Sequence, residues 1–106
     1  MPVALTGDFN FNPSSKEYKM LSDLLEDSYI LCNNAKEEKE ITFHEFSGAT
    51  SLNDSPSKEG RIDFIWVNEK CNPVEVRIVH DFAENDSGIF PSDHWPVFGV
   101  LQCTQD

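Results

Sequence analysis

The chain is poor in basic residues. Lys and Arg together number 8 against 19 Asp and Glu in 106 residues, which gives a formal net charge of −11. Non-specific binding of DNA or RNA rests largely on Lys and Arg side chains that replace counterions at the phosphates. The charge therefore disfavours long nucleic acid as a partner, whereas a small phosphoester substrate, or one brought in by a cation, stays compatible with it.

Cysteine is also scarce, and no Cys-x-x-Cys pair occurs. Cys32, Cys71 and Cys103 are odd in number and far apart in the sequence. This argues against a zinc knot or a disulfide framework, and it favours a reducing intracellular compartment such as the cytoplasm. No apolar run approaches the length of a membrane span, so we expect none. The first residues are too short in apolar side chains to form a signal peptide.

The rest of the composition is that of a folded domain. Hydrophobic residues make up 39% and charged residues 25% of the chain, which are the proportions of a soluble globular protein. A chain of this length forms at most one domain with a modest core. No internal repeat or low-complexity tract is present.

Hydrophobic patterning predicts one or two helices among several strands. Residues 3–6 are expected to form a short buried strand that delivers Asp8 at its end. The spacing of Ser14 and Glu17 is typical of a capping box, and the helix after it has one apolar face, formed by Tyr18, Leu21, Leu24 and Leu25. Further strands are expected at residues 28–31, 41–46, 61–67, 74–82 and 95–101.

Two of these strands have the clearest patterns. Residues 74–82 alternate, with Val74, Val76 and Ile78 on one face. Residues 61–67 are apolar on both faces except at Asp63, which predicts a central strand covered on both sides. The polar segments 47–60 and 83–91 are expected to be loops. The predicted fold class is α/β or α+β, with a mostly antiparallel or mixed sheet.

Three short acidic motifs lie where predicted strands begin, run or end: Gly7-Asp8-Phe9-Asn10, Arg61-Ile62-Asp63-Phe64-Ile65 and Ser92-Asp93-His94-Trp95-Pro96. A carboxylate in an otherwise apolar strand has a desolvation cost. It normally persists only when a hydrogen-bond partner or a cation neutralises it. Together the motifs suggest a metal-assisted hydrolytic centre.

In the first motif, Asp8 and Asn10 are two residues apart and would face one pocket if the segment is extended. The carboxylate would then orient and deprotonate a water molecule, and the Asn10 amide would donate to a phosphoryl oxygen. The alternative is a turn, because glycine, aspartate, asparagine and Pro13 are all turn formers.

The second and third motifs suggest a pair. An aspartate that binds one ring nitrogen of a histidine fixes its tautomer and raises the basicity of the other nitrogen, so Asp63 and His94 are candidate partners. The alternative for Asp63 is an ion pair with Arg61 or Arg77. Asp93 is free to contact a metal ion or the water.

The remaining histidines, His44 and His80, are interpreted as ordinary core or edge residues of strands. Clustered hard oxygen ligands without a cysteine or histidine cage favour Mg²⁺ or Mn²⁺ over zinc. Asp8 and Asp93 are the candidate ligands, and they would form a partial metal site.

In order and context, the three motifs resemble the carboxyl-terminal half of the endonuclease/exonuclease/phosphatase superfamily. Its members share a Gly-Asp-x-Asn strand end, an Arg-Ile-Asp-Tyr-Ile-like strand, in which Phe64 here replaces tyrosine, and a terminal Ser-Asp-His-x-Pro. The resemblance implies a Mg²⁺-dependent phosphoesterase with a layered α/β sandwich fold.

The resemblance also implies roles for five residues. Asp8 would orient or activate the attacking water, and Asn10 would hold the phosphoryl group. His94 would contact the scissile phosphate while paired with Asp63, and Asp93 would lie near the metal ion. Asp8 and His94 both stay candidates for the general base.

The first half of the family's domain carries an asparagine, a metal-binding glutamate and a further histidine, which we do not expect within residues 1–106. The chain is therefore interpreted as a single partial domain, and the activity of this half alone is left open. The alternative is a non-catalytic remnant. Its uncovered apolar face would bind a second copy of the chain or the missing amino-terminal half.

Overall fold

The computed structural model describes residues 1–33, 41–43, 60–79 and 92–104. Within these ranges the elements follow in the order β1 (Ala4–Asp8), α1 (Lys16–Ser22), β2 (Glu26–Asp27), α2 (Ser28–Asn33), β3 (Asp63–Val67), β4 (Cys71–Ile78) and β5 (Val97–Cys103). The histidines at positions 44 and 80, and the two predicted loops apart from Gly60, lie outside the described residues.

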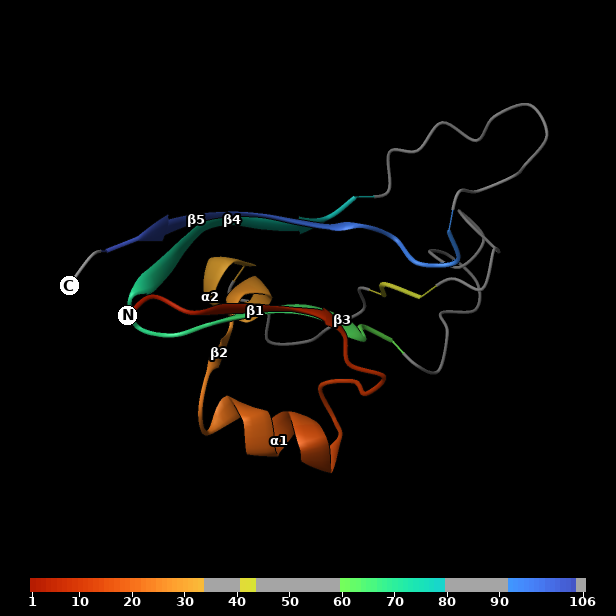
Figure 1. The fold of residues 1–106 in the computed structure, drawn as a ribbon. Coiled ribbons are helices and arrows are strands. Elements are labelled where there is room, and N and C mark those ends of the chain that lie inside the picture. The colour runs from red at the N-terminus through yellow and green to blue at the C-terminus, as the bar shows by residue number, and fades with distance from the viewer. Residues whose placement is uncertain (34–40, 44–59, 80–91, 105–106) are drawn as a thin grey trace.

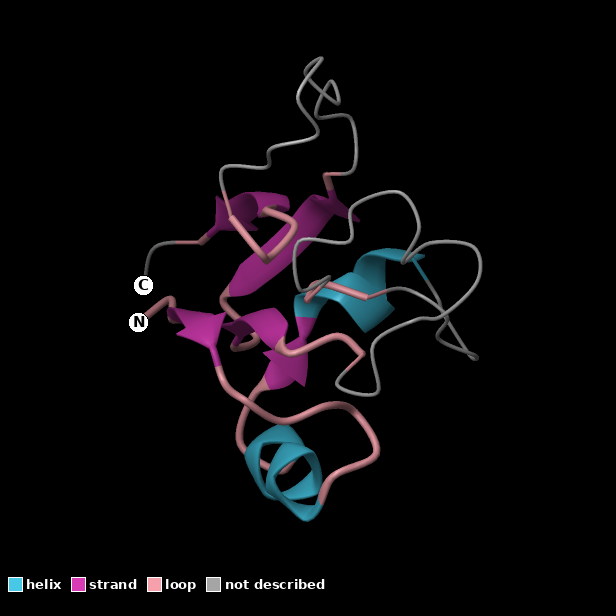
Figure 2. Cartoon of the chain, turned by 90° about the vertical axis from the view of Figure 1, so that its right-hand side faces the viewer, coloured by secondary structure: helices cyan, strands magenta, loops and turns pink. Residues whose placement is uncertain are grey.

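The strands form two antiparallel sheets. One has three strands in the order β1-β3-β2, and the other is the pair β4-β5. The pair lies above the three-stranded sheet, α2 packs against both β3 and β4, and α1 lies on the opposite side of the three-stranded sheet (Figure 1). Figure 2 shows the same layers after a quarter turn. The predicted α+β fold class is confirmed.

Strand β3 is the centre of the core, as predicted from its apolar faces. Phe64 and Trp66 are buried and pack against the rings of Phe9 and Tyr18 on the side of α1, with centroid separations of 5.2–6.5 Å. Because side chains alternate along a strand, Asp63 has the opposite orientation to Phe64 and faces the layer that contains β5. The core thereby determines the side of the sheet on which Asp63 is presented.

A buried ion pair connects the helical side of the core to the residue that precedes β3 by two positions. The Arg61 guanidinium donates to both carboxylate oxygens of Asp27, at 3.0 and 2.5 Å, and the Tyr18 hydroxyl donates to Asp27 Oδ2 at 2.8 Å. Arg61 also lies over the rings of Tyr29 and Phe64. Burial, followed by the contact with Asp27, raises the pKa of Tyr18 to about 12.

The predicted helix after Pro13 is confirmed as α1, but the predicted capping box is wrong. The cap is Ser15, whose hydroxyl accepts from the Tyr18 N–H at 3.1 Å. Glu17 is therefore one residue too early to complete a box with it. The helix ends at Ser22, so residues 24 and 25 lie beyond it.

The strand predicted at residues 28–31 is wrong, because these residues belong to α2. The Asp27 carboxylate accepts from the Tyr29 N–H at 3.2 Å, which satisfies a donor of the first helical turn. The Asn33 side chain then donates to the carbonyl groups of Tyr29 and Val76, both at 2.9 Å, and attaches the helix to β4. Local capping outweighs the strand preference of the apolar side chains.

Strand β1 occurs where a strand was predicted, but the expectation that it is buried is wrong. All five of its residues are exposed, because β1 pairs with β3 along one edge and is an outer strand among the described residues. Leu5 is 42% exposed, and Val3, just before the strand, is 38% exposed. An apolar edge strand of this kind is available for contact with other protein surface.

The strands predicted at 74–82 and 95–101 are confirmed as β4 and β5 with shifted bounds. Val76 and Ile78 are buried as expected, whereas Val74 is 58% exposed. A register shift between Pro73 and Glu75 leaves Val74 outside the pairing, and such a bulge interrupts the alternation. Of the strand predicted at 41–46, residues 41–43 are described, and Phe43 forms an isolated bridge with His94. In the described part of the chain, no helix is long and apolar enough to cross a membrane.

Candidate active site

Two of the predicted carboxylates lie side by side at one end of the three-stranded sheet. Strand β1 ends at Asp8, β3 begins at Asp63, and the antiparallel register places these residues directly opposite each other. Residues paired in this way have their side chains on the same face of the sheet. Two carboxylates in such a position repel each other unless a proton donor or a cation lies between them.

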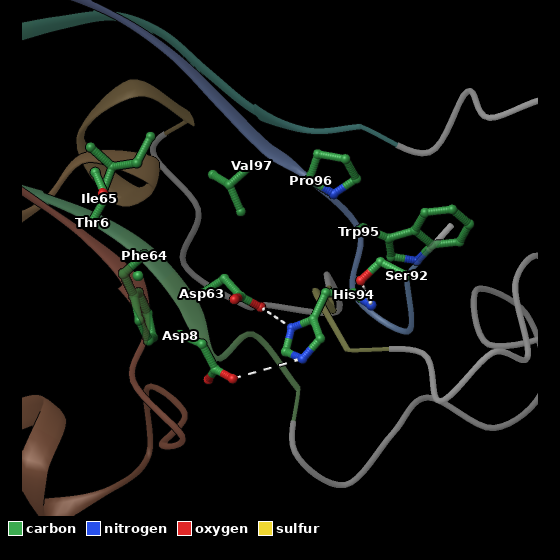
Figure 3. Close-up of a pocket in the computed structure, with 11 residues that line it drawn as sticks. Thr6, Asp8, Asp63, Phe64, Ile65, Ser92, His94, Trp95, Pro96 and Val97 are labelled. Carbon is green, nitrogen blue, oxygen red and sulfur yellow. Dashed lines mark hydrogen bonds and ion pairs between the residues drawn. The ribbon is translucent and has the colours of Figure 1, made fainter. Parts of the chain in front are cut away.

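His94 provides such a donor. Its Nδ1 is 2.7 Å from Asp63 Oδ2, and its Nε2 is 3.7 Å from Asp8 Oδ2 (Figure 3). The same Nε2 is also 3.7 Å from Asp93 Oδ1. An ionised carboxylate only accepts hydrogen bonds, so Nδ1 carries a hydrogen and donates to Asp63. The structure thus places three of the other four predicted site residues, Asp8, Asp63 and Asp93, around the imidazole ring of His94.

The electrostatics of His94 follow from these neighbours. Burial lowers the pKa of the imidazole, but the hydrogen bond to Asp63 and the charges of Asp63, Asp8 and Asp93 raise it by more, so the net shift is upward. Its side chain is 25% exposed, against 39% for Asp8 and 19% for Asp63. The group is therefore partly desolvated but accessible from outside.

A pocket of about 450 Å³ opens over this group. It is lined by residues 6–8 of β1, residues 63–65 of β3, Ser92 and residues 94–97 (Figure 3). The acidic side chains and the imidazole converge on one end of it. A pocket with a few converging polar groups is the usual form of a small-molecule site.

Thr42 aligns the two segments that carry Asp63 and His94. Its hydroxyl oxygen accepts from the N–H groups of Ile62, at 2.9 Å, and Asp63, at 3.1 Å. Its carbonyl oxygen accepts from the N–H of Trp95 at 2.6 Å. Thr42 is fully buried, so this one residue connects the start of β3 to the residue after His94. Sequence reasoning missed it, because no spacing rule relates position 42 to positions 63 and 94.

Ser92 and Phe43 also hold the imidazole in place. The Ser92 hydroxyl accepts from the His94 N–H at 3.0 Å, and the Phe43 ring lies 5.0 Å from the imidazole between ring centroids. Ser92 belongs to the third motif. Serine hydroxyls in turns often accept from the backbone N–H two residues later, so this bond could have been predicted from the sequence. The contact of Phe43 with His94 was not predicted from the sequence.

Asn10 does not follow the geometry expected for it. The chain leaves the extended conformation after Asp8, and Asn10 has φ 57°, in the left-handed region. Its backbone N–H donates to Asp8 Oδ1 at 2.9 Å. The segment is thus the turn that was weighed as the alternative, and Asn10 is not among the residues that line the pocket. The premise that Asp8 and Asn10 share one face of an extended segment is wrong.

The alternative partners of Asp63 are occupied elsewhere. Arg61 pairs with Asp27, and Arg77 lies 3.3 Å from Glu75. Among the described residues, the group whose ligand atoms all lie within 4.8 Å of one another is Asp8, Asp63 and His94. That group includes Asp8 from the predicted pair of metal ligands, whereas Asp93 contacts the site through His94.

The chain belongs to the endonuclease/exonuclease/phosphatase family, whose model matches residues 1–94. This is a family of phosphoester hydrolases that generally use divalent metal ions. The resemblance inferred from the three acidic motifs is confirmed by this match.

Solved structures share the fold. An endonuclease/exonuclease/phosphatase from Bacteroides vulgatus is 25% identical with a TM-score of 0.72, and 97% of this chain covers 37% of it. A mannosyl-6-phosphatase from Bacteroides thetaiotaomicron is 29% identical with a TM-score of 0.73, and the match covers 96% of this chain and 38% of that protein. A protein of unknown function from Enterococcus faecalis V583 is 23% identical, with a TM-score of 0.75 and coverage of 97% and 37%, which shows the fold alone. The comparison with curated proteins gave no match. The chain spans little more than a third of the length of the solved structures that it matches.

Proposed function

We propose that this chain forms the part of a metal-dependent phosphoesterase that carries its aspartate–histidine centre, and that the bond hydrolysed is a phosphodiester or a phosphomonoester. The observation that supports this most strongly is the group formed by Asp63, His94 and Asp8 at the mouth of one pocket. The mannosyl-6-phosphatase among the similar structures makes a phosphomonoester one candidate class.

The residues present fit a hard divalent cation. Asp8 and Asp63 are held opposite each other by strand register, and carboxylate oxygens are the ligands that Mg²⁺ and Mn²⁺ prefer. Asp63 Oδ2 is engaged by His94, so we assign the ion to Asp8, with Asp93 as a second candidate ligand. When bound, such an ion neutralises phosphate charge and stabilises the leaving oxygen.

Asp8 and His94 would have different roles in the proposed reaction. Asp8 Oδ1 accepts from the Asn10 N–H, which leaves Oδ2, on the side of His94, either to ligate the ion or to accept a proton from the attacking water. Asp63 accepts from the Nδ1–H of His94. When the ring is protonated, which its raised pKa favours, the second hydrogen on Nε2 would donate to a non-bridging phosphate oxygen. Asn10, which this turn places two residues after Asp8, stays the candidate that holds the phosphoryl group.

Asp8→Asn and His94→Gln test these roles in a Mg²⁺-dependent assay on bis(p-nitrophenyl) phosphate and p-nitrophenyl phosphate. Each should lower the rate by about 10² or more, the usual contribution of a general acid or base. Asp23→Asn is the matched control, since it removes the same charge from the exposed end of α1. Because the chain spans a third of its structural relatives, the assay is repeated after adding an amino-terminal part from one of them. Absence of activity in both forms would refute the proposal.

The exposure of β1 supports a second candidate function. The strand's residues are exposed, and its outer edge is not paired with any strand of the described residues. A partial domain presents such an edge where further chain would cover it. We therefore propose that residues 1–106 are a partial domain that binds either an amino-terminal part or a second copy through β1. Light scattering tests the second copy, and Leu5→Asp should abolish a dimer. A stable monomer that does not bind an added amino-terminal part would exclude this function.

A further inference from the structure

Two cysteines that lie far apart in the sequence face each other across the β4-β5 ladder. Cys71 is the first residue of β4 and Cys103 is the last residue of β5. The register pairs them directly, and their Sγ atoms are 2.6 Å apart. Both are free thiols in the structure. The candidate site is therefore a dithiol formed by β-sheet pairing, which the linear spacing of the cysteines did not reveal.

The backbone at this position suits a covalent bond. The Thr104 N–H donates to the Lys70 carbonyl at 2.8 Å, which makes positions 70 and 104 a hydrogen-bonded pair and places Cys71 and Cys103 at the adjacent non-hydrogen-bonded position. At such positions the Cα atoms are about 4.5 Å apart and the side chains approach each other most closely. Disulfides span Cα separations of about 4.4–6.8 Å.

The two thiols differ in access. Cys103 is exposed, whereas Cys71 is 4% exposed. The contact with the Cys103 thiol, together with burial, raises the pKa of Cys71. A reagent from solution therefore meets Cys103 first, and Cys71 is placed to react with whatever forms there. Cys32, whose thiol donates to the Pro73 carbonyl at 3.5 Å, is the remaining free thiol.

We propose that Cys71 and Cys103 form a site of reversible thiol–disulfide exchange with a low-molecular-weight disulfide such as oxidised glutathione. The Cys103 thiolate attacks one sulfur of the reagent, which forms a mixed disulfide and releases one glutathione thiolate. Cys71 loses its proton and attacks the Cys103 sulfur, which releases the second glutathione. Two protein thiols are oxidised to one disulfide, and one reagent disulfide is reduced to two thiols.

The bond would close a loop of about 30 residues that contains all of β4, all of β5 and the segment with His94. Closing a loop of that size is expected to stabilise the fold appreciably. Cys103 is six residues along β5 from Val97, at about 3.3 Å per residue. The bond would therefore tie down the far end of the strand that leads away from His94, without contact with the site itself.

The test uses the purified chain in oxidised glutathione, followed by mass spectrometry of the intact protein and of its proteolytic peptides. The expected product has lost two hydrogens, contains a peptide cross-linked between Cys71 and Cys103, and returns to the starting mass in dithiothreitol. Its melting temperature should be higher than that of the reduced chain by on the order of 10 °C. Retention of both thiols, or a cross-link that involves Cys32, would overturn the proposal.

Three variants separate the steps. Cys32→Ser should give the same cross-link and the same rise in melting temperature. Cys71→Ser should leave Cys103 carrying a stable glutathione adduct, because no resolving thiol remains, and Cys103→Ser should be modified much more slowly at Cys71. Faster modification of Cys71 than of Cys103 would contradict the assigned order of attack.

Discussion

Thr42 gives the sharpest test of how the site is built. Replacing Thr42 by valine keeps the shape of the side chain but removes the hydroxyl oxygen that accepts from two backbone N–H groups. The bond to Ile62 is buried and the bond to Asp63 is partly buried. A buried donor left without a partner costs about 1–3 kcal/mol, and a partly buried one costs less. We therefore expect Thr42→Val to lower the free energy of unfolding by about 2–4 kcal/mol.

Thr42→Ser is the matched control, because it keeps the hydroxyl and removes one buried methyl group. A lost buried methyl group costs about 1 kcal/mol, so serine should be clearly less damaging than valine. Urea unfolding of the three proteins measures the difference, with the dependence on urea expected to be unchanged. If the valine variant is as stable as the serine variant, the hydroxyl does not hold the start of β3 in place, and the reasoning is refuted.

Further predictions concern His94 and the buried ion pair. The folded pKa of His94 lies above the ordinary value of 6.5, so its stabilising contribution is fully present below about pH 6.5 and is lost as the pH rises through the folded value. The difference in unfolding free energy between the natural chain and Asp63→Asn should accordingly shrink with rising pH, and a constant difference would contradict this. Asp27→Asn leaves Arg61 as a buried charge without its carboxylate. It should lower the free energy of unfolding, measured in urea, by about 3–5 kcal/mol. No change in that free energy would show that the ion pair is dispensable. The same variant should lower the pKa of Tyr18 from about 12 only partway towards 10, because burial is the largest cause of the raised pKa and is not removed. Absorbance of the tyrosine during alkaline titration measures this pKa. Added Mg²⁺ should raise the melting temperature of the natural chain but not of Asp8→Asn, and an equal rise in both would place the ion elsewhere.

Several features could be predicted from the sequence because they depend on local pattern. The apolar run with a single carboxylate predicted β3 as a central strand. The alternation of Val76 and Ile78 predicted the buried face of β4. The approximate position of α1 followed from the spacing of Tyr18 and Leu21. In each case the periodicity of hydrophobic residues is determined by burial on one face, so the pattern can be read without the partner.

Other features depend on contacts between distant residues. The helix at 28–33 forms because Asp27 caps it while also binding Arg61. Arg61 is 34 residues from Asp27 in the sequence, so a local pattern does not reveal this contact. The pairing of Cys71 with Cys103 follows from strand register. Asp63 and His94 were proposed as partners from their chemistry, whereas Thr42, which aligns their segments, had no chemical signal.

The register of β1 on β3 has a consequence for ligand affinity. Asp8 lies at the end of a strand that is exposed along its whole length, and the strand is held to the described part of the sheet by its pairing with β3. Whenever β1 detaches, the site loses the Asp8 carboxylate. The apparent affinity for a cation is then the intrinsic affinity multiplied by the fraction of molecules in which β1 is docked. Conversely, a bound cation should slow hydrogen exchange of the β1 amides, so that the strand itself reports occupancy of the site.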